Sequence, residues 1–229
     1  MRVRALAAAT GAALLLGGCG SATSSGAPTD SATPVEDRTG ASVALDAAEA
    51  MQWAGSVHVT GAMTQAGIRQ AIDLHLQAED VVGTIETAGQ ELEILVTGGA
   101  TFARAATGFW TARGMPPEVA PSLDGAWVLM PAEAAAELGA LTLDGLVEQL
   151  RDTYGLHDEV RTLERKGVAV HVVSHDDGSR LVVEAHDPGY PLELSTAGGA
   201  AGALKYTRFG EREDITAPVD FINLAEFAG

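Results

Sequence analysis

Residues 57–63 (VHVTGAM) and 72–76 (IDLHL) decide the fold, because apolar residues or glycine recur at every second position along both segments. A period of two is typical of a β-strand with one buried face. Ala66-Gly67 supplies the two residues of a tight turn between them, so the sequence predicts an antiparallel hairpin. A slip of one residue would move every apolar side chain to the other face. The pairs expected on the buried face are Val57 with Leu76 and Val59 with Leu74.

The same alternation continues after this hairpin, with turns expected at Gly89 and at Gly98-Gly99. The stretch 104–125 carries Pro116, Pro117 and Pro121 and shows no period, so we expect it to be irregular. The strands predicted in this part of the chain are 81–85, 92–96, 101–103 and 127–129.

The C-terminal third predicts a second series of hairpins. Lys166-Gly167, Asp177-Gly178 and Pro188-Gly189 are turn signals about eleven residues apart. If the last two pairs are two-residue turns, one apolar face runs across three strands, and a final strand follows at 203–209. The cross-strand pairs expected are Val172–Val183, Val170–Ala185, Ala185–Leu192 and Val183–Leu194, with His171–Glu184, His175–Arg180 and Glu184–Glu193 on the other face.

Helices are predicted before and between the two series of strands. Residues 43–53 form one, with Ser42 as its N-cap. Pro131–Leu138 forms a second, with proline in its first turn. Thr142 caps a third, whose apolar stripe is Leu143, Leu146, Val147 and Leu150. The fold class expected is therefore α+β: one large curved antiparallel sheet of about ten strands, covered on one side by helices.

Composition and charge exclude several classes of protein. The 229 residues include 31 acidic and 14 basic side chains, a net charge of −17, which argues against a nucleic-acid partner. The chain has one cysteine, so it forms no internal disulfide and no cysteine-based zinc site.

The sequence contains no recognisable catalytic or phosphate-binding motif, so we expect a protein that is not an enzyme and that holds no cofactor. His171 and His175 lie four residues apart on a strand, about 13 Å, too far to share one metal ion. His58 and His75 would face each other on the solvated side of the first hairpin. We therefore expect no metal site, and we expect all six histidines on solvated sheet surfaces.

The N-terminus has the pattern of an export signal. Arg2 and Arg4 precede an uncharged run at 5–16, which is too short to span a bilayer. The run ends in Leu16-Gly17-Gly18-Cys19, which resembles the lipobox of bacterial lipoproteins. The resemblance implies cleavage before Cys19, a diacylglyceryl group on its sulfur and further acylation, for example by palmitate. Such chains hold a protein on a membrane. The domains expected are a signal peptide at 1–18, the lipidated cysteine with a flexible Ser/Thr/Ala/Gly tether at 19–42, and one domain at 43–229.

The order of patterns over 43–224 resembles the LolA-like lipoproteins, in particular the LppX/LprG group of actinobacterial lipoproteins. The segments that carry the resemblance, besides the lipobox, are 55–59 (GSVHV), 83–85 (GTI), 92–96 (LEILV), 98–102 (GGATF), 108–110 (GFW), 125–128 (GAWV) and 215–218 (ITAP).

The resemblance implies an open half-barrel whose concave face is covered by helices. It also implies a cell-envelope protein, lipid-anchored on the extracytoplasmic face, that binds or carries a lipid or lipoglycan between sheet and helices. The candidate cavity lining is Val57, Val59, Leu74, Leu76, Ile85, Ile94, Val96, Phe102, Trp110, Trp127, Leu129, Leu146 and Leu150.

Three functions stay open at this point. The same apolar residues can line a ligand cavity or form a packed core. A packed core favours a monomeric accessory lipoprotein that acts as the partner of an envelope protein such as a membrane sensor or transporter. An enzyme would require buried polar side chains that converge, which no spacing in the sequence indicates.

Overall fold

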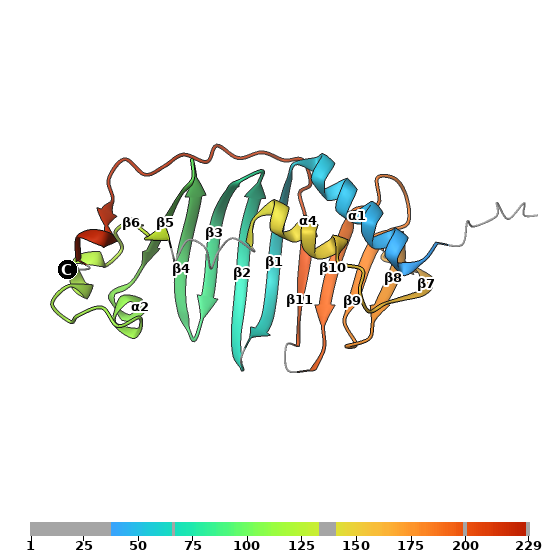
Figure 1. Ribbon diagram of the computed structural model, residues 1–229, viewed down its shortest axis with the longest axis horizontal. Coiled ribbons are helices and arrows are strands. Elements are labelled where there is room, and N and C mark those ends of the chain that lie inside the picture. The colour runs from blue at the N-terminus through green and yellow to red at the C-terminus, as the bar shows by residue number, and fades with distance from the viewer. Residues whose placement is uncertain (1–37, 66, 133–140, 199–200, 228–229) are drawn as a thin grey trace, which may run out of the picture. The chain divides into compact units, whose positions relative to one another are not determined.

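A computed structural model describes residues 38–65, 67–132, 141–198 and 201–227, all within one folded unit that spans Asp37–Gly229 (Figure 1). Its strands form one sheet in the order β12-β6-β5-β4-β3-β2-β1-β11-β10-β9-β8-β7. The strands are β1 (Ser56–Gln65), β2 (Ile68–Gln77), β3 (Asp80–Thr87), β4 (Gln90–Thr97), β5 (Ala100–Ala105), β6 (Val128–Leu129), β7 (Leu156–Arg165), β8 (Val168–His175), β9 (Arg180–Glu184), β10 (Pro191–Thr196), β11 (Gly202–Thr207) and β12 (Ile222–Asn223).

The predicted fold class is confirmed. The two end strands, β7 and β12, do not pair with each other, so the sheet is open. Every neighbouring pair is antiparallel except β12 with β6. The described residues form twelve strands where the sequence predicts about ten. The two-residue strand β12 is too short to show a period.

The first hairpin has the predicted register. Val57 lies opposite Leu76, and Val59 lies opposite Leu74. All four side chains are at most 2% exposed. Strict alternation and a short turn therefore suffice to specify this pairing.

The register predicted between β8 and β9 is wrong by one residue. Val172 lies opposite Val182, and His171 lies opposite Val183. The turn after β8 is longer than two residues, because His175 N–H donates to Ser179 O over 2.9 Å. The last pair before this turn is Ser174 with Arg180. The other pairs predicted between β8 and β9 fail for the same reason.

A register shift between Pro191 and Glu193 moves β10 as well, so Leu194 lies opposite Leu181 and Glu193 opposite Val182. The like-charge pair Glu184–Glu193 therefore does not form. Val173 then faces the main apolar core, while Val170 and Val172 pack with Val182 in a separate cluster on the other face. Both faces of these strands are apolar, which is why the sequence pattern allowed a wrong register.

The helices begin where short polar side chains cap them. Helix α1 spans Gly40–Ala54, and Thr39 Oγ1 accepts a hydrogen bond from Ser42 N–H over 3.1 Å. Thr39 rather than Ser42 is therefore the N-cap, and the last residues of the predicted tether are helical. Helix α4 spans Leu143–Arg151 with Thr142 as its predicted cap. A short helix α2 (Thr107–Ala112) and 3₁₀ turns η1 (Ala120–Leu123) and η4 (Leu224–Phe227) complete the set, so 104–125 is more ordered than expected.

The predicted helix at Pro131–Leu138 falls almost entirely outside the described residues. Helix α1 starts unusually close to the sheet: a Cβ on Gly40 would lie 2.1 Å from His157 O. Only glycine fits there, so this residue belongs to the packed domain rather than to a spacer.

One face of the sheet carries both long helices. Figure 1 shows α1 and α4 lying over β1 and the strands from β11 to β8, and α1 contacts β1, β7, β8, β9, β10 and α4. The main core lies between these helices and the sheet, and it includes Met51, Leu74 and Val147. A second core surrounds Trp110 of α2, beside β4, β5 and β6.

The opposite face is partly covered by residues 208–221, here called the C-terminal strap. The strap leads from β11 to β12 past the intervening strands (Figure 1). Ser56 Oγ donates to Glu211 O over 2.6 Å, and Glu213 N–H donates to Gln77 Oε1 over 3.0 Å. At its far end Phe221 packs edge-on against Phe102 with ring centroids 5.2 Å apart.

The strap buries a histidine that the sequence places in solvent. His75 lies opposite His58 as predicted, but it is 3% exposed. Neither of its ring nitrogens has a hydrogen-bond partner among the described residues. Glu213 Oε1 lies 3.8 Å from His75 Nδ1, which is too long for a hydrogen bond. His171 is also buried, so for both histidines the expected solvated position is wrong.

Replacement of His75 by leucine is expected to leave the free energy of unfolding unchanged or to raise it by about 1 kcal/mol, since a buried unpaired polar group costs about 1–3 kcal/mol. Urea denaturation monitored by circular dichroism measures the change. His58→Leu is the matched control. It removes a contact of 2.7 Å to Asp73 Oδ1 and should lower stability by about 0.5 kcal/mol. A loss of 2 kcal/mol or more in His75→Leu would show that the imidazole does have a partner.

Candidate functional site

A cavity of about 240 Å³ lies between the helices and the C-terminal half of the sheet. Helices α1 and α4 supply one wall, and strands β8 to β11 supply the other. The residues that line it are Ala44, Leu146, Gln149, Leu150, Asp152, Tyr154, Leu156, Val173, His175, Asp177, Ser179, Arg180, Leu181, Leu194, Thr196 and Tyr206.

The apolar part of this lining belongs to the main core. Val173, Leu181 and Tyr206 are buried, and Leu146 and Leu150 face them from α4. The i, i+4 spacing of the two leucines puts them on one face of the helix. These apolar side chains form one wall of the cavity, and the space between them is not completely filled by packing.

The polar part of the lining is held by hydrogen bonds around the turn after β8. His175 Nε2 lies 2.9 Å from Tyr154 O, and Asp177 N–H donates to His175 Nδ1 over 3.1 Å. Hydrogen bonds from the backbone and hydroxyl of Ser179 hold the pKa of Asp177 below its usual range, with His175 adding to the effect. Asp177 and Tyr154 are exposed, so the polar side of the cavity opens to solvent.

The predicted lining is divided among three places. Leu146 and Leu150 line the cavity. The other residues on the helix-covered face lie in the two cores, and the largest of them are almost fully buried. The first core contains Val57, Val59, Leu74 and Leu76, the second contains Ile94 and Trp110, and Ile85 and Val96 pack against both.

Phe102, Trp127 and Leu129 lie on the opposite face, which corrects their assignment to the concave lining. Phe102 pairs with both Leu95 and Leu129, and cross-strand partners share a face. Trp127 stacks under the guanidinium of Arg104, 4.7 Å from the ring centroid. The C-terminal strap lies on this side of the sheet, so these aromatic side chains pack beneath it.

The sequence reasoning missed most of the strand residues that line the cavity. Val173, Leu181 and Leu194 lie in strands that the sequence predicts, but the predicted register differs from the observed one by one residue between β8 and β9 and by two to three between β9 and β10. Tyr206 lies opposite Val59 in the neighbouring strand β1. The sequence signal for Tyr206 was the alternation of Leu204 and Tyr206 with the polar residues Lys205 and Thr207, which indicates that Tyr206 lies on the buried face of the strand.

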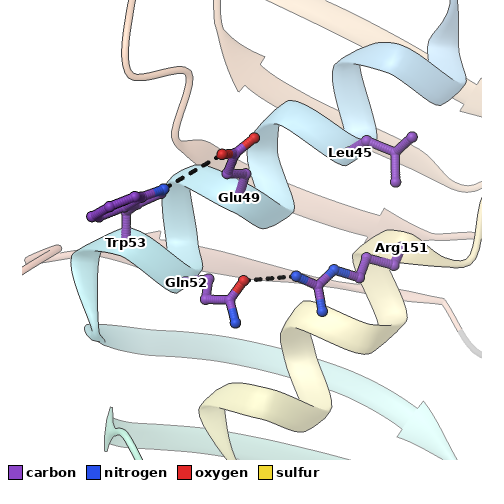
Figure 2. Close-up of a pocket in the computed structure, with 5 residues that line it drawn as sticks. All are labelled: Leu45, Glu49, Gln52, Trp53 and Arg151. Carbon is purple, nitrogen blue, oxygen red and sulfur yellow. Dashed lines mark hydrogen bonds between the residues drawn. The ribbon is translucent and has the colours of Figure 1, made fainter.

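A larger groove of about 550 Å³ lies on the outer surface of α1 and α4 (Figure 2). Leu45, Glu49 and Trp53 form a stripe along α1, and Arg151 of α4 donates to Gln52 Oε1 over 2.7 Å. Trp53 is 83% exposed. The hydrogen bond between Arg151 and Gln52 joins the two helices across this groove. The groove lies on the surface, and none of its lining residues belongs to the apolar core.

The described residues contain neither a candidate metal site nor a candidate membrane-spanning helix. Within them, no group of three or more His, Cys, Asp or Glu side chains is arranged to hold a metal ion. In the same part of the chain, no helix is long and apolar enough to cross a membrane.

The fold is that of the LolA-like proteins: a large, open, mostly antiparallel sheet with few helices. A particular protein with a similar structure is LprF from Mycobacterium bovis, with a TM-score of 0.53 and 16% sequence identity. The match covers 78% of this chain and 96% of LprF. It confirms, at the level of the fold, the resemblance to LppX/LprG-type lipoproteins. No protein-family model and no curated protein sequence matches the chain.

Proposed function

We propose that this protein is a lipid-anchored envelope lipoprotein that binds an acyl chain, or another apolar ligand, in the cavity between α1, α4 and strands β8–β11. The observation that carries the proposal is the cavity itself, which has an apolar wall and a polar, solvent-exposed side. Such a lining suits an amphiphile whose tail is buried and whose head group stays near water. The role proposed is binding or carriage, with no catalytic step.

The size of the cavity limits what it holds without movement. A volume of 240 Å³ is room for about eight groups the size of a water molecule, at about 30 Å³ each. Burial of eight methylenes contributes about 6 kcal/mol before the cost of association. A longer acyl chain either extends through the solvent-exposed side of the cavity or requires α4 to shift away from the sheet. The residues that resist this shift are Leu146, Val147 and Leu150 in the core and Arg151 at the hydrogen bond to Gln52.

The anchor is proposed from the sequence. Cys19 follows Leu16-Gly17-Gly18, and α1 begins at Gly40, so the acylated cysteine is joined to the domain by about twenty residues. A coil of that length reaches roughly 25 Å. In this proposal the cavity lies within reach of the extracytoplasmic membrane surface, from which an acyl ligand would come.

A cavity-filling variant tests ligand binding. Leu150→Trp places an indole in the cavity, while Leu45→Trp makes the same substitution at an exposed position of α1 and is the matched control. Each full chain is purified in the same detergent, extracted with organic solvent and analysed by mass spectrometry for non-covalently bound lipid. We expect lipid from the wild type and from Leu45→Trp, and at least about tenfold less from Leu150→Trp.

Equal lipid recovery from all three chains, or none above the detergent blank from the wild type, would contradict ligand binding in this cavity. Thermal melting followed by circular dichroism shows whether Leu150→Trp remains folded. A folded variant that has lost its lipid supports the proposal.

An accessory role in protein contacts is the second candidate, and the exposed Trp53 favours it. An indole that is 83% exposed beside Leu45 on one helix stripe is the kind of aromatic group that anchors protein interfaces. A photoreactive amino acid at position 53 would crosslink a specific envelope protein in living cells. The same group at Leu163, exposed on β7, is the control and should not crosslink it.

A further inference from the structure

Tyr206 is the buried polar group of the cavity wall. It lies on β11 opposite Val59, and its side chain is 3% exposed. Among the described residues its hydroxyl has no hydrogen-bond partner. Buried tyrosine hydroxyls usually have one, so an unpaired hydroxyl here needs an explanation.

The hydroxyl is open to the cavity. In the part of the chain that the structure describes, the ring nitrogens of His75 are the side-chain atoms that are both sealed from solvent and unpaired. The Tyr206 hydroxyl is unpaired but is not sealed, and the space that Tyr206 lines is the cavity. The phenol therefore presents a free donor to whatever fills that space.

We propose that Tyr206 determines ligand specificity by donating a hydrogen bond to an oxygen acceptor, an ester or carboxyl oxygen, of the acyl ligand. This inference rests on the proposed function and adds to it: the ligand is an oxygen-bearing acyl compound and not a plain hydrocarbon.

The protonation state of the group agrees with this role. Burial raises the pKa of Tyr206, so its hydroxyl keeps its proton at neutral pH and acts as a donor. The apolar cavity lining on β9 and β10, Leu181 and Leu194, offers no side-chain acceptor. A hydrocarbon in the cavity would leave the buried hydroxyl unpaired, whereas an ester would satisfy it.

Two matched photoreactive probes test the inference: a diazirine-bearing decane and a diazirine-bearing methyl decanoate. The full wild-type chain, Tyr206→Phe and Tyr190→Phe are each reconstituted in phosphatidylcholine vesicles and irradiated with either probe. The yield of crosslinks to cavity peptides is measured by mass spectrometry. Each probe is compared between variants at constant vesicle concentration, so its partition into the bilayer cancels.

We expect Tyr206→Phe to reduce crosslinking by the ester about tenfold and to leave the hydrocarbon unchanged. Tyr190→Phe, which changes a tyrosine outside the cavity lining whose ring stacks on Phe209, should alter neither. Equal losses for both probes, or no loss for either, would overturn the specificity role of Tyr206 while leaving ligand binding intact. Absence of crosslinks from both probes in the wild type would refute the proposed function and this inference with it.

Discussion

Replacement of Cys19 by alanine is expected to abolish acylation of the chain. The thiol is the only sulfhydryl in the sequence, and it follows the lipobox pattern Leu16-Gly17-Gly18. Without it there is no sulfur for a diacylglyceryl group and no amino-terminal cysteine for a further acyl chain. Metabolic labelling of bacteria that express the full chain with an alkyne-bearing palmitate, followed by intact-mass measurement, reads out the change. The labelled wild type should also have lost residues 1–18.

The control moves the cysteine instead of removing it. In the double variant Cys19→Ala with Ser21→Cys, a thiol is present but Gly18 stands three residues before it, where the lipobox has leucine. We expect this variant to remain unlabelled, like Cys19→Ala alone. Label in either variant, or an unlabelled wild type, would rule out acylation of Cys19 and with it the proposed anchor.

The first hairpin was predictable to the residue because one pattern decides it. Between Val57 and Leu76, the large aliphatic side chains occupy one face only, and the pairing continues to Gln65 opposite Ile68. The helix at 143–151 was equally clear, since a capping threonine precedes a stripe of aliphatic side chains. In both cases local conformation and burial favour the same structure.

The second series of strands was not predictable in register. Strands β8 and β9 are apolar on both faces, with Val173 in the main core and Val172 in the cluster behind the sheet. A shift by one residue then still buries apolar side chains on both faces, so the length of the turn determines the register. Asp177-Gly178 looked like a two-residue turn, but the loop is closed by the bond between His175 and Ser179.

The position of the cavity depends on packing, which a pattern does not contain. Alternation identified Val57 and Leu74 as inward-facing, and they are buried. The alternation does not indicate that the space under the helices is filled beside Val57 and Leu74 but left open beside Leu181 and Tyr206. The C-terminal strap was hidden for a related reason, because an irregular segment has no period to indicate that it covers His75 and Phe102.

Replacement of Gly83 by alanine is expected to lower the free energy of unfolding by about 3–5 kcal/mol, since strain at a positive φ and overpacking each cost about 1–3 kcal/mol. Gly83 lies in the middle of β3, opposite Leu74 of β2 and Ile94 of β4, with a φ of +149°. A Cβ there would lie 2.0 Å from Asp73 O and 2.9 Å from Leu74 Cα, both backbone atoms of the neighbouring strand. Strand β2 would have to move away, and the sheet pairing that supports the main core would be disturbed.

Gly89→Ala separates the clash from the strain. Gly89 also has a positive φ, +75°, but a Cβ at this turn would have no atom within 4 Å. Its replacement should cost about 1 kcal/mol, the penalty of a left-handed conformation alone. Urea denaturation of the wild type and both variants measures the difference. Equal losses in the two variants would show that backbone conformation, and not the close approach of β2 to β3, is what requires glycine at position 83.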